Sequence, residues 1–176
     1  MVRNIVLAFC SLLLLQLHPS CRSSSGEEQY EEMIPSAVLH SGPDSGFIAC
    51  DSTLWDHVYN AERLFVVEKC KKVNGYIRYI RSEKDGDFHI LLELDKGQEK
   101  LINGKNIARQ KGCLVVEPVC AARVTQPGAE ASCGTFVNRV KIPPAGTHVT
   151  VTGTYVLDKH HGWMEIHPVT GIEIIP

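Results

Sequence analysis

The 176-residue sequence lacks the short motifs that identify the common enzyme classes. It has no phosphate-binding loop, because the one stretch that resembles such a loop, Gly42-Pro43-Asp44-Ser45-Gly46, has neither the lysine nor the following helix that such a loop needs. No G-x-S-x-G sequence marks a serine-hydrolase nucleophile, and no C-x-x-C pair marks a zinc or thiol-redox site. Motifs alone therefore favour no catalytic class.

The sequence also lacks a large excess of charge of either sign. Its formal net charge is -2, and its acidic residues gather near the N-terminus. Only Arg3 and Arg22 among Lys and Arg, but five of the acidic residues, precede residue 46, which leaves 16 basic and 15 acidic residues after them. A protein that binds duplex DNA carries a clear basic excess. We therefore expect no duplex nucleic-acid partner.

No apolar run is long enough to span a bilayer, which takes about 20 residues. The run that comes nearest, Ile5 to Leu15, follows the short basic start Met1-Val2-Arg3-Asn4 and ends before the helix-breaking His18-Pro19. A charged start, a short apolar core and a small residue at the end are typical of a secretory signal. The sequence therefore predicts a signal peptide over residues 1–20.

The residues at the end of this segment have two interpretations. Leu17-His18-Pro19-Ser20-Cys21 resembles the lipobox of bacterial lipoproteins, although His18 and Pro19 depart from the usual residues. The resemblance implies that Cys21 is lipidated and that the partner is the membrane. In the other interpretation, signal peptidase cuts after Ser20 and Cys21 is an ordinary cysteine.

Residues 21–45 are rich in serine and acidic residues, which predicts a flexible tether. We expect an exported protein in the periplasm or on the outer surface, anchored as a lipoprotein.

Five cysteines remain in the part of the chain that we expect to fold, residues 46–176: Cys50, Cys70, Cys113, Cys120 and Cys133. Export permits disulfides. Because five is an odd number, at least one of these thiols stays free or pairs outside the domain. We expect Cys120 to pair with Cys133, since the two flank one loop, and a bridge of that size contributes about 3 kcal/mol.

The sequence predicts a mainly β domain over residues 46–176. A short helix or lid is expected within residues 47–62, followed by strands over 63–81, 87–95, 114–117, 148–158 and 163–168. Gly75, in the middle of the first strand, favours a bend over a hairpin turn. Residues 101–106 are expected to form a turn, and His167-Pro168 to end the last strand, since proline donates no hydrogen bond. One curved strand, a long irregular connection and a closing hairpin predict a five-stranded barrel like the OB-fold.

Two motifs of the domain carry a resemblance to a known group. They are Asp85-Gly86-Asp87-x-His89, followed by an apolar strand, and Trp163-x-Glu165-Ile166-His167-Pro168-Val169 near the C-terminus. With the long glycine-containing first strand, the pattern resembles uncharacterised exported bacterial proteins that have a small OB-fold-like barrel domain. The resemblance covers residues 63–175. It implies the fold and the compartment, and it implies no activity.

Most of the candidate site residues lie on two strand faces. Asp87, His89 and Glu93 share one face of the second strand, and Trp163, Glu165 and His167 share one face of the last. If the faces meet, with His161 from the hairpin turn, they suit a divalent metal held by His89, His161, Glu165 and His167, or an acid/base pair. The alternative is structural: polar residues alternate on a solvent-facing strand, or His89 is a buried imidazole that holds the preceding turn.

Three functions follow from these patterns. The first is a non-enzymatic binding or structural module of the cell envelope, with an unknown ligand or envelope protein as partner and no cofactor, or at most a divalent metal. The second is a nuclease-like, metal-dependent hydrolase that uses the His/Glu cluster. The third is a single-strand nucleic-acid or glycan binder, favoured by the basic residues Lys69, Lys71, Lys72, Arg78, Arg81 and Lys84 on or next to the first strand.

Overall fold

The computed structural model describes residues 50–176. The predicted signal peptide (1–20), the predicted tether (21–45) and Cys21 lie outside the described residues. Across 50–176, the helices are all too short or too polar to cross a bilayer.

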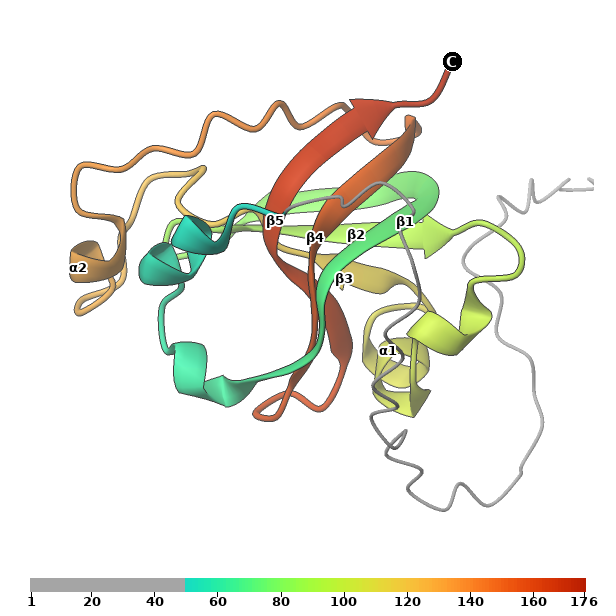
Figure 1. Ribbon diagram of the computed structural model, residues 1–176, viewed down its shortest axis with the longest axis horizontal. Coiled ribbons are helices and arrows are strands. Elements are labelled where there is room, and N and C mark those ends of the chain that lie inside the picture. The colour runs from blue at the N-terminus through green and yellow to red at the C-terminus, as the bar shows by residue number, and fades with distance from the viewer. Residues whose placement is uncertain (1–49) are drawn as a thin grey trace, which may run out of the picture.

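Five strands form a mixed sheet that closes in a ring (Figure 1). They are β1 (Leu64–Ser82), β2 (Phe88–Leu94), β3 (Leu114–Val116), β4 (His148–Asp158) and β5 (Met164–Ile174). Their order around the ring is β1-β2-β3-β5-β4. β3 and β5 run parallel, and every other neighbouring pair is antiparallel. The prediction of a mainly β domain with five strands is confirmed.

β1 is one long strand that serves two neighbours. Its first part pairs with β4 and its last part with β2, and Gly75 pairs with both Val149 and Leu94. A Cβ atom at Gly75 would lie 2.2 Å from the carbonyl oxygen of Glu93, closer than any real contact. Only glycine fits where the strand passes from one partner to the other. The structure therefore excludes a hairpin turn at Gly75, because β1 continues through it as one strand, and the nearest register irregularity lies between Ile77 and Tyr79.

β5 is longer than predicted. The expectation that His167-Pro168 ends the strand is wrong, because the strand continues to Ile174. The ladder between β4 and β5 changes register between Gly153 and Tyr155, next to Pro168. At such an irregularity the missing N–H of a proline costs little. A Cβ at Gly153 would lie 2.5 Å from the Pro168 carbonyl oxygen, so glycine lets the two chains approach here.

The helices are short, and some were not predicted. The helix expected within 47–62 is two 3-10 helices, η1 (Ser52–His57) and η2 (Ala61–Arg63), and Asp51 caps η1 by accepting from the Thr53 N–H. The turn predicted over 101–106 is wrong, because η3 (Glu99–Leu101) ends there and α1 (Gly104–Arg109) begins there, capped by Asn103. α2 (Glu130–Cys133) lies in the long connection before β4.

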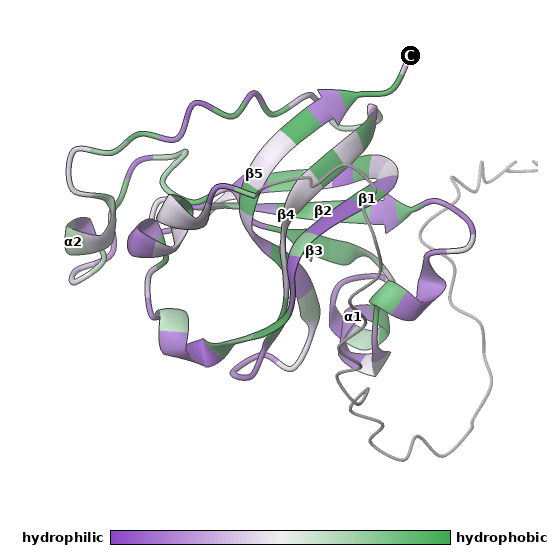
Figure 2. Ribbon diagram, viewed as in Figure 1, coloured by the Kyte–Doolittle hydropathy of each residue, from purple (hydrophilic) through white to green (hydrophobic). Residues whose placement is uncertain are grey.

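Two layers of packing form on opposite faces of the sheet. An apolar core fills the ring, and Ile90, Leu114 and Ile166 belong to it. Because side chains alternate along a strand, the neighbours of these residues occupy the other face of β2, β3 and β5. On that face Leu91 and Val115 pack with Cys113 and Trp163. η1 and the segment around Cys120 pack together against Leu64 of β1 and Val156 of β4. All three residues of β3 are buried and apolar (Figure 2), so this strand lies between the two layers.

Two disulfides link described residues. Cys120–Cys133 is the predicted bridge, and Cys50–Cys70 ties the start of η1 to β1. Cys113 is disulfide-bonded as well. These disulfides are compatible with an exported protein.

Candidate functional site

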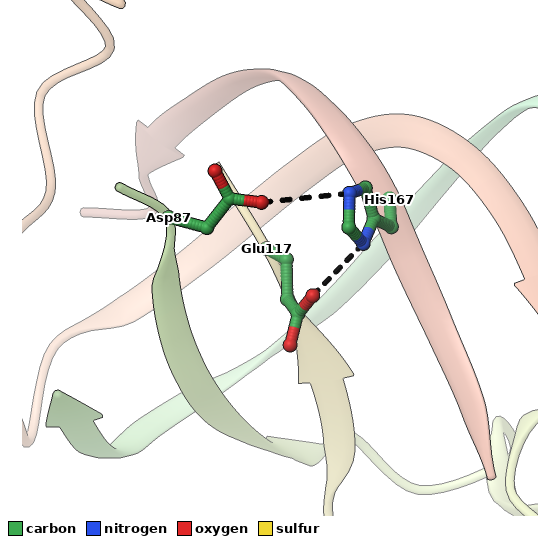
Figure 3. A group of neighbouring side chains, drawn as sticks. All are labelled: Asp87, Glu117 and His167. Atoms are coloured by element: carbon green, nitrogen blue, oxygen red, sulfur yellow. Dashed lines mark ion pairs between the residues drawn. The ribbon is translucent and has the colours of Figure 1, made fainter. Parts of the chain in front are cut away.

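Five buried ionisable residues meet on the covered face of the sheet: Asp87, His89, Glu117, Glu165 and His167. We call them the carboxylate–histidine cluster. Asp87 precedes β2 and His89 lies in it, Glu117 follows β3, and the last two residues lie in β5. β3 pairs with both β2 and β5, so the three elements bring these side chains together (Figure 3).

Glu117 is the centre of the cluster. Its Oε1 lies 2.9 Å from Nδ1 of His89, and its Oε2 lies 2.8 Å from Nδ1 of His167. Nη2 of Arg63 lies 3.7 Å from Oε2. Burial alone would raise the pKa of Glu117, but the hydrogen bonds from the two imidazoles outweigh it and lower the pKa below its usual range. Glu117 is therefore an ionised carboxylate shared by two histidines.

His167 is fully buried among three carboxylates. Besides Glu117, its Nδ1 lies 3.3 Å from Oε2 of Glu165, and its Nε2 lies 3.7 Å from Oδ2 of Asp87. Burial disfavours a charged imidazole. The hydrogen bonds to Glu117 and Glu165 nevertheless raise the pKa of His167 to about 10. The carboxylates thus favour a positive charge on this ring at neutral pH.

Asp87 faces His167 from the other side of the ring, as Figure 3 shows. Its Oδ1 accepts a hydrogen bond of 2.9 Å from the Cys120 N–H. Among the described residues, its Oδ2 and the facing Nε2 of His167 have no hydrogen-bond partner. Burial raises the pKa of Asp87 to about 7, against the opposing charge of His167. Two buried polar atoms therefore face each other across a gap too long for a hydrogen bond.

Glu165 is buried beside an aromatic ring. The indole N–H of Trp163 donates to its Oε1, while its Oε2 faces His167. Burial and the nearby charge of Glu117 raise the pKa of Glu165. Trp163 thus acts as a hydrogen-bond donor to the cluster as well as a packing residue.

A second group lies at the edge of the cluster, at the turn between β4 and β5. The buried carboxylate of Asp158 is paired with Arg63 and lies 2.7 Å from Nδ1 of His161, whose ring stacks on Trp163. Burial opposes ionisation of Asp158, but its hydrogen bonds with His161 and the charge of Arg63 lower its pKa. Arg63 reaches both Asp158 and Glu117, so it links the two groups.

His89 connects the cluster to the surface. Its Nδ1 meets Glu117, and its Nε2 lies 3.1 Å from Oε1 of Gln110, the residue after α1. An acceptor oxygen at each nitrogen favours the protonated form of the ring. Burial opposes this charge, but the hydrogen bond to Glu117 outweighs it and raises the pKa of His89.

A cleft of about 230 Å³ opens above His89, between β1, β2 and α1. We call it the basic cleft, and it is lined by Tyr79, Arg81, His89, Leu91, Arg109, Gln110 and Lys111. Arg81, Arg109 and Lys111 are exposed. Arg81 is paired with Glu83 at 2.6 Å, whereas Arg109 and Lys111 form no ion pair within residues 50–176. The cleft therefore offers positive charge to a ligand.

The structure brings together most of the residues that the sequence singled out. Asp87, His89, Glu165 and His167 meet, and Trp163 joins them. His161 lies at the edge, in contact with Asp158 and Trp163. Glu93 is elsewhere, paired with Arg78. The predicted metal set of His89, His161, Glu165 and His167 does not form one group: the sets whose donor atoms converge are Asp87–Glu117–His167 and Asp158–His161–Glu165.

Sequence reasoning missed Glu117 as the residue on which the two histidines meet. Its signal was present, since a carboxylate follows directly on the fully apolar Leu114–Val116 and precedes a proline. A charge at the end of a strand buried on both faces must find a partner. Arg63 was missed because it lies at the very start of the predicted first strand, far from the motifs in sequence.

The chain matches no protein-family model, and no curated protein is significantly similar to it. Its chemistry is therefore inferred from geometry. Burial is the first constraint, because Glu165 is 1% exposed and His167 0%. A substrate cannot touch these side chains unless the covering segments move. The groups near the cluster that solvent reaches are His161 and the cations of the basic cleft.

Proposed function

We propose that this domain is a non-enzymatic binding module with an OB-fold-like barrel, and that it takes an anionic ligand in the basic cleft. The observation that carries the proposal is the convergence of Arg81, Arg109 and Lys111 on one concave site, with the imidazole of His89 on its buried side. Guanidinium and ammonium groups are the usual partners of phosphates and carboxylates.

The rim of the cleft supports a ligand that also carries a planar ring. Tyr79 is 47% exposed beside the cations, and exposed aromatic side chains stack on nucleic-acid bases. A volume of about 230 Å³ suits a small group better than a whole polymer. A single nucleotide, or the end of a single strand, combines the two features. This choice unites the binding module and the single-strand binder that the sequence predicted.

The hydrolase alternative receives less support from the geometry. A general acid or base must come within hydrogen-bond reach of its substrate. The five residues of the carboxylate–histidine cluster are all at least nine-tenths buried, and they satisfy most of their polar atoms among themselves. Their contacts are those of a structural network that holds three strands and a covering segment together.

The proposal is tested by titrating the protein with a fluorescent, 5′-phosphorylated oligothymidylate. We expect salt-sensitive binding, because contacts with phosphates release counterions. Reversing the charge at Arg109→Glu or Lys111→Glu should weaken binding at least tenfold. Lys141→Glu, an exposed lysine outside the cleft, is the matched control and should change it little. Salt-independent or absent binding contradicts the proposal.

One further variant distinguishes a ligand bound in the basic cleft from a ligand bound along the basic side chains of β1. Lys71 is paired with Glu68 at 2.6 Å and Arg78 with Glu93, so two of these cations are already engaged. We expect Lys72→Glu, an exposed position on β1, to weaken binding less than Lys111→Glu. An equal or larger effect would place the ligand along β1 and outside the cleft.

We also propose that the protein is exported and anchored to the membrane through a lipid on Cys21. The disulfides support export. Cys21→Ser should release the protein from membranes, because the acyl chains of the anchor are attached at this residue. Unchanged partitioning would refute the anchor.

A further inference from the structure

Two buried polar atoms on facing elements lack partners within the described part of the chain. Oδ2 of Asp87 and Nε2 of His167 are 3.7 Å apart, and their residues are 3% and 0% exposed. Buried polar atoms are almost always satisfied, so each exception calls for a partner such as an ion or a water. Both atoms are aimed at the same point, which is where that partner would lie.

The spacing of these atoms suits a metal ion. Two ligands about 2.1 Å from a tetrahedral zinc ion lie about 3.4 Å apart, close to the observed separation. Donor atoms of Asp87, Glu117 and His167 all lie within 4.8 Å of one another, so modest side-chain rotation brings the third ligand, the Glu117 carboxylate, into reach. Imidazole with carboxylates is a donor set of zinc and of related divalent ions.

The surroundings of His167 match those of a metal-ligating histidine. Such a ring usually donates its second N–H to a carboxylate, which fixes the tautomer and leaves the other nitrogen for the metal. Here Glu165, whose Oε2 lies 3.3 Å from Nδ1, can accept this N–H once Glu117, now 2.8 Å from Nδ1, turns to the metal, while Nε2 faces Asp87. The carboxylates that now favour a proton on the ring would equally stabilise a cation bound to it.

We infer that Asp87, Glu117 and His167 hold one divalent transition-metal ion, of which zinc fits best, in a buried structural site. The ion joins the start of β2, the end of β3 and the middle of β5, three elements that meet at this cluster. Its role is to fix the covered face of the sheet. The site is independent of the basic cleft, and no chemical step passes through it.

The experiment uses the full chain, produced by export so that its disulfides form, then stripped with a chelator and titrated with Zn²⁺. We expect one ion per chain, a rise in melting temperature on binding, and its reversal by chelator. Replacement of zinc by Co²⁺ should give the intense visible bands of a four-coordinate site. No binding to the wild-type chain, with no change in melting temperature, overturns the inference in favour of a bridging water.

Asp87→Asn is the decisive variant, because it keeps the shape and the hydrogen bond from Cys120 but weakens the ligand. It should bind Zn²⁺ at least tenfold more weakly while its circular dichroism is unchanged. The competing donor set is Asp158–His161–Glu165, and the ring of His160 lies 5.1 Å from that of His161. The double variant His160→Gln/His161→Gln should keep the ion. Equal affinity in Asp87→Asn, or loss in the double variant only, would overturn the inference.

Discussion

At the scale of single residues, Glu117 has the largest role in the cluster. Its two oxygens each bind a different imidazole, and it lies between β3 and the segment that covers it. Removing one partner of a buried ion pair usually costs about 3–5 kcal/mol, because the remaining charge is left unpaired. Here one substitution at Glu117 would leave both His89 and His167 without the carboxylate that they share.

We therefore expect Glu117→Gln to lower the free energy of unfolding by about 3–5 kcal/mol. Urea denaturation followed by circular dichroism, in the presence of a chelator, measures the change. Glu93→Gln is the matched control, since Glu93 forms a partly exposed pair with Arg78 and should cost less than about 1 kcal/mol. Equal effects of the two substitutions would show that the cluster contributes no more than a surface pair.

Glu165 is a useful contrast within the same cluster. Burial and the charge of Glu117 raise its pKa, so a neutral side chain is tolerated here more easily than at Glu117. The substitution Glu165→Gln would keep an oxygen that accepts from the Trp163 N–H. The two glutamates are adjacent in space, yet their electrostatic roles differ because one receives two imidazoles and the other receives one.

At the scale of elements, the strands could be predicted and most of the helices could not. Alternation of apolar residues marked β2 and β4, because each has a face in the core of the ring. α1 is a six-residue helix, too short for a period to show. β5 ran past its predicted end because a register change in the ladder accommodates Pro168, and sequence alone does not reveal where a ladder changes register.

The bend of β1 leads to a prediction at this scale. A methyl group at Gly75 would meet the Glu93 carbonyl at 2.2 Å, so Gly75→Ala must move β1 away from β2. We expect a loss of about 3 kcal/mol or failure to fold. Gly171→Ala, in β5, is the control, because a Cβ there meets no atom within 4 Å. Thermal unfolding of both proteins measures the difference, and a Gly75→Ala variant as stable as Gly171→Ala would contradict the account of the bend.

At the scale of the whole molecule, sequence could not decide which face of the sheet meets solvent. Polar and charged residues alternate with apolar ones on β2 and β5, and this pattern is the same for a solvent-facing sheet and for a buried polar network. A second layer decides the matter: Cys113 and Trp163 pack on Leu91 and Val115, and the segment around Cys120 lies against Asp87. That layer depends on long-range packing and on a disulfide, and neither leaves a local period in the sequence. The convergence of Asp87, His89 and His167 was foreseen from strand faces, but their common partner was not.

The contacts that close the ring lead to a prediction about how the stability of the protein depends on pH. Arg63 at the start of β1 and Asp158 at the end of β4 join the two strands that close it, and His161 adds a second contact. The pKa of Asp158 is lowered from 3.8, so its contribution to stability is present above about pH 4 and is lost as the pH falls through the folded-state value.

Urea unfolding from about pH 5 to about pH 2 should therefore show a fall in the free energy of unfolding. This fall should be shallower in Asp158→Asn, where the part that remains is due to Glu117. Asp56→Asn, on the exposed side of η1, should follow the wild-type curve. If Asp158→Asn falls as steeply as wild type, the pair between Arg63 and Asp158 does not stabilise the closed ring.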